Sequence, residues 1–234
     1  MKLYQQVPIQ ECGESLLPIP IYQFAAEQPH PYVRLGAPYG ERSPYYLRQG
    51  VLERLLQAQH FLQIEYPNWR IQIFDAYRPI AVQQFMVDYT LAQTVQARGL
   101  HLWDLTETQR QEFLEEVYEF WAVPNLNPAM PPPHSTGAAI DVTLVDGEGA
   151  IAMGSPIDEM SPRSYPDYFR DSLSNRTFHH NRQILKQAMI KAEFRQHPKE
   201  WWHYSHGDQL WAWLGNQASE SPLIAQYGRA EDFF

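Results

Sequence analysis

Apolar residues recur at helical spacing in several parts of the chain. Leu52, Leu55 and Leu62 share one side of a helix, and Pro67 follows them. We therefore expect a helix from about residue 50 to about residue 65. The same periodicity predicts three further helices, over 82–98, 104–122 and 181–194.

The expected helix over 104–122 has a marked beginning and end. Thr106 is a candidate N-cap, and Gln109 follows three residues later, which is the spacing of a capping box. The segment "VPNLNPAMPPPH" then breaks the helix with five prolines. Periodicity leaves open whether 100–131 forms a lid over a site or packs as ordinary core.

A short strand is predicted where apolar and polar residues alternate. Ile71 and Ile73 alternate with the polar Gln72, and Pro79 stops the pattern. Asp75 and Arg78 then lie at the end of this strand, and strand ends carry chemistry more often than strand middles.

Two further strands are expected in the second half of the chain. The first is "AIDVTLV", residues 139–145, with a turn at the following "DGEG". The second runs through "RQHPKEWWHYSH", residues 195–206, and leads to Glu200 and His203.

The first part of the chain is rich in proline and aromatic residues and has little periodicity. We interpret residues 1–45 as an extended arm wrapped over a core, because a disordered segment would contain fewer aromatics. No repeat, low-complexity tract or linker is visible, so residues 1–234 are expected to form a single domain.

Composition narrows the class of protein. The net charge is −9 and no basic cluster is present, which argues against nucleic acid or an anionic membrane as partner. Cys12 is the single cysteine, so no intramolecular disulfide is possible, and a buried free thiol is expected. No signal peptide or apolar run of membrane-spanning length is visible, which predicts a cytoplasmic protein.

The stretch "PPHSTGAAID" places His134 and Asp141 seven residues apart. A strand would point these side chains to opposite faces, so a strand alone does not bring them together. A turn at Gly137 that leads into the strand would let His134 fold back toward Asp141. The two side chains would then converge on one metal ion.

A catalytic zinc ion takes three protein ligands and leaves a fourth position for water. His134, Asp141 and His203 would provide two histidines and one carboxylate, and Glu200 lies three residues before the last of them. A carboxylate beside the metal, but not bound to it, can move protons during hydrolysis. Nine histidines allow many chance pairings, however, so residue types alone leave the function open.

The joint pattern of "HSTGAAID" and "EWWH" resembles the zinc D-alanyl-D-alanine dipeptidases of the vancomycin-resistance type, in peptidase family M15. "FDAYRP", "DVTL", "MGSPID" and "NRQILKQAMIKAEF" also match that family, in order, between Tyr45 and Trp213. The resemblance implies an α+β fold in which helices flank a small antiparallel sheet, the hedgehog-like zinc fold of the D,D-peptidases. It also implies hydrolysis of a small D,D-dipeptide of cell-wall metabolism, D-Ala-D-Ala, to two D-alanines.

The resemblance assigns roles to individual residues. It implies that one zinc ion is bound by His134, Asp141 and His203, and that Glu200 is the general base. Arg78 would stabilise the negatively charged oxygen of the tetrahedral intermediate, as a permanently protonated guanidinium can. The alternative for Arg78 is a structural salt bridge with Asp75 or another acid. Asp158, in "MGSPID", stands where the family holds the free amine of the substrate.

The chain departs from the family at Pro132. These dipeptidases have a serine there that binds the terminal carboxylate of the substrate, and proline offers neither a hydroxyl nor an N–H group. Either Ser135 or another donor replaces it, or the preferred dipeptide differs. The competing interpretations are a D,D-carboxypeptidase acting on longer peptidoglycan stems, a non-catalytic zinc-containing binding module, and a structural protein without metal.

Overall fold

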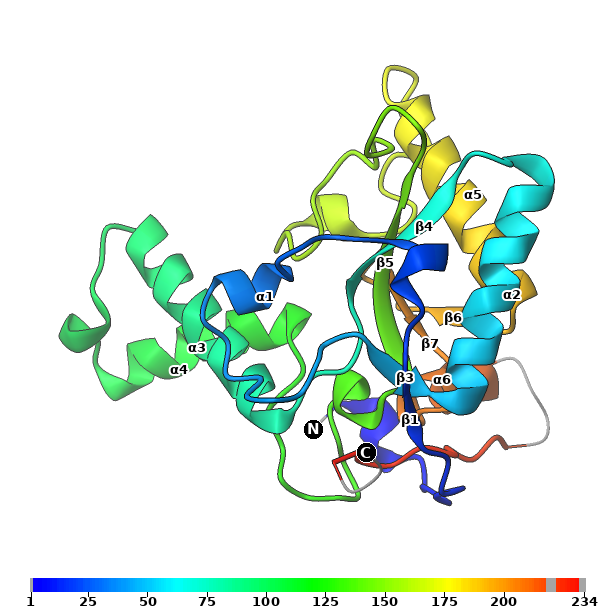
Figure 1. The fold of residues 1–234 in the computed structure, drawn as a ribbon. Helices are drawn as coiled ribbons and strands as arrows, with labels where there is room; N and C mark the ends of the chain where they lie inside the picture. The colour runs from blue at the N-terminus through cyan, green and yellow to red at the C-terminus, as the bar shows by residue number, and fades with distance from the viewer. Residues whose placement is uncertain (1, 218–221, 232–234) are drawn as a thin grey trace.

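A mixed five-stranded sheet lies at the centre of the protein (Figure 1). The structure is a computed structural model that describes residues 2–217 and 222–231. Its strands are β1 (Leu16–Pro18), β2 (Ala25–Ala26), β3 (Tyr46–Arg48), β4 (Arg70–Asp75), β5 (Ala139–Val145), β6 (Arg195–Gln196) and β7 (His203–Ser205). The large sheet has the order β2-β4-β5-β7-β6, while β1 and β3 form a separate antiparallel pair. In the large sheet β2 and β4 are parallel, and the other neighbours are antiparallel.

One face of the sheet is covered by two helices that pack against each other (Figure 1). The helices of the described residues are α1 (Pro31–Arg34), α2 (Gln49–Glu65), α3 (Ile80–Ala97), α4 (Glu107–Phe120), α5 (Arg176–Lys191) and α6 (Gln209–Asn216). Leu55 and Leu62 of α2 and Leu185 of α5 join the same buried core as Ile73 and Val142 of the sheet. The apolar residues of β4 and β5 that face α2 and α5 therefore leave the alternate residues to the opposite face.

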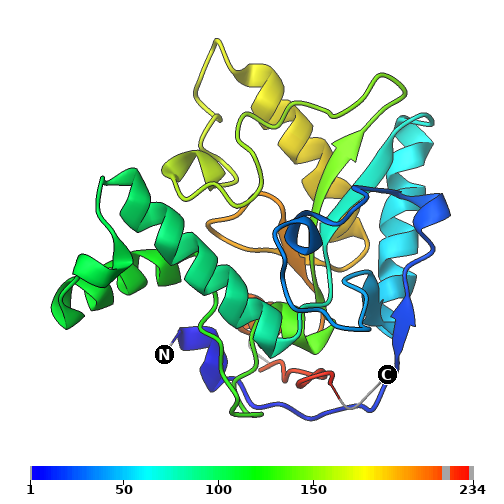
Figure 2. The ribbon, with the colours of Figure 1, turned by 60° about the vertical axis from the view of Figure 1, so that its left-hand side comes forward.

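A second apolar cluster lies between α3 and α4, which project together from the body of the protein (Figure 2). Val87 and Leu91 of α3 pack there with Val117 of α4 and with Trp121, which follows it. Thr106 caps α4 and exchanges hydrogen bonds with Gln109, as the sequence predicts. Packing against α3 holds the end of α4 in place, and this end borders the cavity described below.

The first 45 residues form more local structure than an extended arm. They include β1, β2 and α1, and β2 extends the large sheet by pairing with β4. A single domain over the whole chain stays our proposal.

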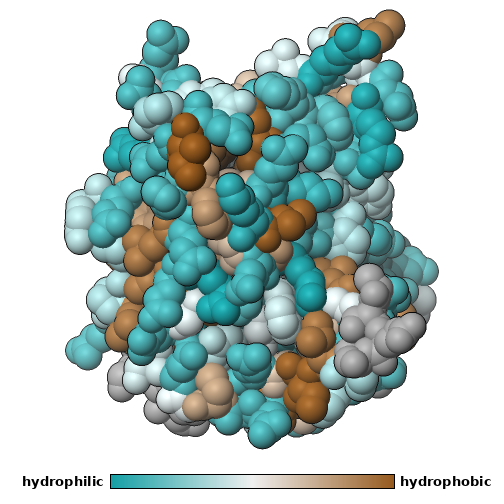
Figure 3. All heavy atoms as spheres, turned by 90° about the vertical axis from the view of Figure 1, so that its right-hand side faces the viewer, coloured by the Kyte–Doolittle hydropathy of each residue, from teal (hydrophilic) through white to brown (hydrophobic). Residues whose placement is uncertain are grey.

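The surface over α2 is mainly hydrophilic, with isolated hydrophobic side chains between the polar ones (Figure 3). In the described ranges, 2–217 and 222–231, no helix is long and apolar enough to cross a membrane. Cys12 is free and exposed, so the expectation of a buried thiol was wrong.

The α+β class and the predicted helices are confirmed, with shifted bounds in places. The helix expected over 181–194 is α5, which begins earlier, at Arg176, and ends at Lys191. The single strand expected over 195–206 is instead two short strands, β6 and β7, which pair with each other, and Glu200 lies in the loop between them. Helix α6 was not predicted from the hydrophobic pattern.

Candidate active site

The register between β5 and β7 places two of the expected metal ligands side by side. Asp141 of β5 lies directly opposite His203 of β7, so both side chains leave the same face of the sheet. This is the face away from α2 and α5, because Ile140 and Val142 point into the main core. Nδ1 of His203 lies 3.0 Å from Oδ1 of Asp141.

The turn before β5 brings His134 back to the same point. Gly137 has a φ of 69°, a left-handed conformation that favours glycine, and a side chain there would overlap Leu16. The buried Arg48 fastens this turn, because its backbone N–H donates to the carbonyl of Gly137 and its Nε donates to the carbonyl of Thr136. The predicted turn at Gly137 is thus confirmed, and His134 folds back toward Asp141.

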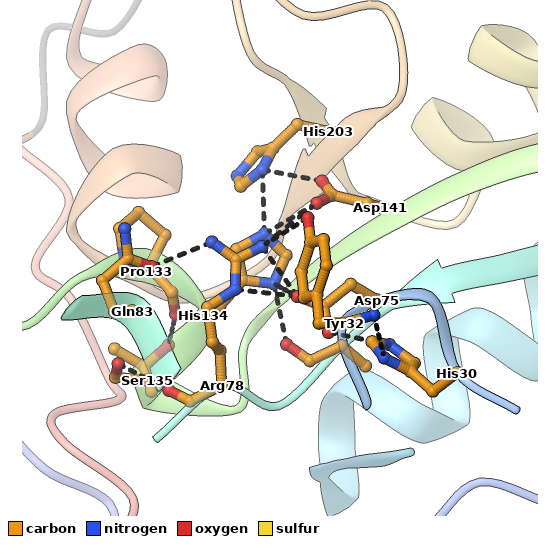
Figure 4. Close-up of polar contacts among 12 residues, drawn as sticks. His30, Tyr32, Asp75, Arg78, Gln83, Pro133, His134, Ser135, Asp141 and His203 are labelled. Carbon is orange, nitrogen blue, oxygen red and sulfur yellow. Dashed lines mark hydrogen bonds and ion pairs between the residues drawn. The ribbon is translucent and has the colours of Figure 1, made fainter. Parts of the chain in front are cut away.

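The three side chains form one cluster of donor atoms (Figure 4). One ligand atom from each of His134, Asp141 and His203 lies within 4.8 Å of the others, and all three residues are buried. Nε2 of His134 is 3.2 Å from Oδ2 of Asp141 and 3.2 Å from Nδ1 of His203. The structure therefore brings together all three residues that the sequence nominated as ligands.

Two observations fit a metal ion at this cluster. Nδ1 of His134 is 2.7 Å from the backbone carbonyl of Ala76, so Nδ1 carries the proton and Nε2 presents a lone pair. Oδ1 of Asp141 is buried and has no hydrogen-bond partner among the described residues, although Nδ1 of His203 is close. A buried carboxylate oxygen without a donor is rare, and a cation would satisfy it.

Ser205 and Asp208 orient the His203 ring through its second nitrogen, Nε2. Nε2 lies 3.4 Å from the hydroxyl of Ser205, which itself donates to the carboxylate of Asp208. The Ser205 oxygen can therefore accept a hydrogen bond from the N–H group at Nε2, which leaves Nδ1 without a proton and free to bind a metal. The donor set of two imidazoles and one carboxylate is one that zinc accepts.

Asp141 is ionised in this setting. Burial raises the pKa of its carboxyl, but the neighbouring His134 and His203 outweigh burial, so that the pKa falls well below its usual range. The carboxylate is then ready to bind a cation at neutral pH.

Glu200 lines the same cavity but stands outside the cluster of three donors. Its Oε2 is 3.6 Å from Nδ1 of His203, and its Oε1 is 3.6 Å from Nδ1 of His197. Burial raises the pKa of the Glu200 carboxyl to about 7, against the opposing effect of His203. A carboxyl with such a pKa can take up and release a proton near neutrality.

Arg78 both forms a structural ion pair and faces the cavity. Its Nε and Nη2 donate to Oδ2 of Asp75 at 2.9 and 2.7 Å, and its Nη1 donates to Gln83. The guanidinium lies 5.1 Å from the ring centre of Tyr32 and 5.0 Å from that of Trp121. Nη2 is also 3.6 Å from Asp141, so the fixed positive charge adjoins the metal cluster.

An irregularity in β4 places Asp75 beneath Arg78. The register shifts after Ile73, so that Asp75 rather than Phe74 lies opposite Asp141. Such bulges re-aim side chains next to active sites. Asp75 is fully buried, and His30 and Tyr39 hold its other oxygen at 3.1 and 3.2 Å.

Asp158 enters the cavity from the loop after β5. It has a φ of 64°, which an aspartate tolerates better than most residues, and the Tyr32 hydroxyl donates to its Oδ2 at 2.7 Å. Burial and the charge of Asp141 raise the pKa of its carboxyl to about 7, against the opposing effect of Arg78.

Replacing Asp158 by asparagine is expected to stabilise the metal-free protein most above pH 7. The carboxyl has a pKa of 3.8 when unperturbed and of about 7 when folded, so the free energy of unfolding falls as pH rises across this window. Asparagine does not titrate, and its side-chain oxygen can still accept the hydrogen bond from the Tyr32 hydroxyl. In thermal unfolding, the gain in Tm should be larger at pH 8 than at pH 5 by roughly 5–10 °C. An equal gain at both pH values, or a loss at pH 8, would contradict this.

Ser135 does not reach the cavity. It is fully buried, and its hydroxyl donates to the backbone carbonyl of Arg78 at 2.7 Å. The geometry gives it a role in holding the Arg78 loop and gives no support to substrate contact. The cavity is instead lined by several residues that the sequence did not single out, namely Lys2, Tyr4, Gln83, Phe120, Trp121 and His197.

Comparisons with known proteins agree with this geometry. A family model described as D-ala-D-ala dipeptidase (Peptidase_M15) matches residues 25–222. A D-alanyl-D-alanine dipeptidase of Synechocystis sp. is 49% identical over 241 aligned positions, which cover 99% of this chain and 98% of the relative. A D-alanyl-D-alanine dipeptidase of Enterococcus faecalis is 35% identical over 78 residues, 32% of this chain and 37% of that protein.

Two solved structures are similar to this chain at a lower level. The LdcB LD-carboxypeptidase has a TM-score of 0.45 and 14% identity, over 84% of this chain and 69% of that one. The vancomycin resistance D,D-pentapeptidase VanY, in complex with Zn(II), has a TM-score of 0.45 and 16% identity, over 88% of both chains. Likeness at this level supports no statement about the site. The family match and the full-length relative are decisive, and the chain belongs to the D-ala-D-ala dipeptidase family of peptidases, Peptidase_M15.

Proposed function

We propose that this protein is a zinc-dependent dipeptidase that hydrolyses a small D,D-dipeptide, D-alanyl-D-alanine, to two D-alanines. The family and the Synechocystis relative support the reaction. The observation that carries the proposal is the convergence of His134, Asp141 and His203 in one cavity with Glu200 and Arg78 beside them.

The three convergent residues would hold one zinc ion through Nε2 of His134, a carboxylate oxygen of Asp141 and Nδ1 of His203. When bound, zinc supplies a Lewis acid that polarises a peptide carbonyl and makes water more acidic. The chain itself contributes the orientation of these ligands, through the Ala76 carbonyl behind His134 and Ser205 behind His203.

Glu200 moves the protons of the reaction. Its carboxylate accepts a proton from the attacking water and delivers that proton to the nitrogen of the leaving D-alanine, as the C–N bond breaks. Its exclusion from the donor cluster suits this role, because both of its oxygens remain available. A non-catalytic zinc module would not need a carboxylate at this place.

Arg78 stabilises the oxygen on which negative charge develops. Asp75, Gln83 and the rings of Tyr32 and Trp121 fix the guanidinium before substrate arrives, so little reorganisation is needed. The ion pair with Asp75 is therefore part of the catalytic arrangement, and the structural and functional interpretations of Arg78 agree.

Asp158 selects a dipeptide with a free amine. If its carboxylate pairs with the substrate ammonium, acetylation removes that charge and adds bulk at the same point. A charged hydrogen bond contributes about 1.5–3 kcal/mol, so N-acetyl-D-Ala-D-Ala should have a kcat/KM about tenfold to a hundredfold lower than D-Ala-D-Ala. Steady-state kinetics on the two compounds measure this ratio.

A variant and a matched control sharpen the test. Asp158→Ala should abolish most of the preference for the free dipeptide. Asp167→Ala should keep it, because Asp167 pairs with Arg170 at the surface. Equal cleavage of both compounds by the wild type would overturn the dipeptidase proposal and favour a D,D-carboxypeptidase acting on longer stem peptides, with the same metal ligands.

A further inference from the structure

The carboxylate of the proposed substrate lacks its expected partner. Pro132 stands where the family resemblance implies a serine, and Ser135 is buried against the Arg78 carbonyl. Arg78 is assigned above to the oxygen on which negative charge develops, and its guanidinium is held there by Asp75 and Gln83. A dipeptide carboxylate in this cavity therefore needs another hydrogen-bond donor, and a cationic donor would also balance its charge.

The N-terminal segment forms one wall of the cavity. Lys2 and Tyr4 line it, and the 3-10 helix Leu3–Gln6 packs against α6. Nε2 of the buried Gln209, on α6, donates to the backbone carbonyls of Gln5 and Val7 at 3.3 and 2.7 Å. These hydrogen bonds fix the backbone of the N-terminal segment, which keeps Lys2 at the cavity.

The Lys2 ammonium has N–H groups that are available to bind a ligand. Its Nζ is 3.4 Å from the carbonyl of Trp121, and among the described residues no carboxylate forms an ion pair with it. An ammonium offers three donors, so at least two remain for a ligand. In the described part of the chain, two lysine or arginine side chains line this cavity, those of Lys2 and Arg78.

Lys2 and Asp158 line the same cavity and contact different groups: Nζ of Lys2 lies 3.4 Å from the Trp121 carbonyl oxygen, and Oδ2 of Asp158 accepts a hydrogen bond from the Tyr32 hydroxyl. Burial lowers the pKa of the Lys2 ammonium, and Glu200 is the charged group that acts on it most strongly. The pKa of the Asp158 carboxyl responds first to burial and then to Asp141 and Arg78. An ammonium at Asp158 and a carboxylate at Lys2 would suit a dipeptide, which spans about 7 Å.

The chemistry of the reaction predicts the same orientation of the dipeptide, with its carboxylate toward Lys2. Glu200 must protonate the nitrogen of the leaving residue, which is the residue that bears the free carboxylate. A cation close to Glu200 is therefore on the carboxylate side of the scissile bond.

We propose that the Lys2 ammonium binds the terminal carboxylate of the dipeptide, in place of the serine that Pro132 has replaced. This assignment rests on the proposed dipeptidase function, and it makes the N-terminal segment a determinant of substrate choice.

The test compares D-Ala-D-Ala with its C-terminal amide, in which the negative charge is absent. The wild type should cleave the amide with a kcat/KM about tenfold to a hundredfold lower. Lys2→Met should lower kcat/KM for D-Ala-D-Ala by a similar factor, mainly through KM, and leave the amide unchanged. Lys2→Arg should retain most of the preference. Equal Tm values would show that the variants are folded.

Lys199→Met is the matched control, because the Lys199 side chain is 43% exposed and pairs with Glu119. It should leave the ratio between the two compounds unchanged. If Lys2→Met slows both compounds by the same factor, or changes kcat alone, Lys2 acts through Glu200 and the proposal is overturned. If the wild type cleaves neither compound, the proposed dipeptidase function is contradicted, and the Lys2 assignment that rests on it is contradicted too.

Discussion

Glu200→Gln is expected to lower kcat for D-Ala-D-Ala by about a hundredfold or more while one zinc ion per chain remains bound. The amide keeps the size of the side chain but cannot accept the proton from water. Glu200 stands outside the cluster of His134, Asp141 and His203, so metal binding does not depend on it. Steady-state kinetics and metal analysis of the purified variant measure the two effects separately.

Glu193→Gln is the matched control. Glu193 precedes β6, is exposed and pairs with Arg54 at 2.9 Å, far from any role in the cavity. The Glu193→Gln variant should retain the kcat of the wild type. Turnover near wild type in Glu200→Gln, or loss of zinc from it, would contradict the assignment of Glu200 as general base.

His203→Ala is expected to abolish both zinc binding and turnover. A site with three protein ligands cannot readily lose one, and His203 also contacts Asp141 and His134 directly. The purified variant should contain less than about a tenth of the wild-type zinc, since metal affinity falls steeply with the loss of a ligand. Metal analysis after dialysis without added zinc makes the measurement.

His206→Ala controls for the loss of a buried histidine from the same region. His206 is 5% exposed, packs against Trp211, and lies 3.1 Å from the Glu193 carbonyl. Its replacement should lower stability but leave zinc content unchanged. Full zinc occupancy in His203→Ala would show that another residue is the ligand.

The parts of this site that depend on local geometry could be predicted from the sequence. Gly137 frees the backbone for a turn, and the alternation along 139–145 sets the face of Asp141, so the approach of His134 to Asp141 follows from short-range rules. The capped start of α4 is local in the same sense. The roles of Glu200 and Arg78 came from resemblance to a family, and they stay predictions.

Other features depend on contacts between distant segments, which no short-range rule describes. The bulge that aligns Asp75 with Asp141 is a property of the pairing between β4 and β5. Tyr32 comes from the one-turn helix α1, too short for a periodic signal, and reaches Asp158 across 126 residues of sequence. Lys2 reaches the cavity because Gln209 holds the N-terminal segment in place.

The error over residues 195–206 has a comparable cause. Periodicity suggested one strand, but β6 and β7 pair with each other and leave Glu200 in the loop between them. A strand would have limited the approach of Glu200 to one face of the sheet. Ser135 was proposed as a donor in place of the serine that is missing at Pro132, but its hydroxyl donates a hydrogen bond to the Arg78 carbonyl. Which way a single side chain points depends on such tertiary contacts.

The most direct test is hydrolysis of D-Ala-D-Ala by protein that has been stripped with a chelator and then titrated with zinc. We expect no turnover in the stripped protein, full recovery at about one zinc ion per chain, and no cleavage of L-Ala-L-Ala at any point. Turnover of D-Ala-D-Ala that survives complete removal of metal, or its absence from the zinc-loaded protein, would contradict the central claim.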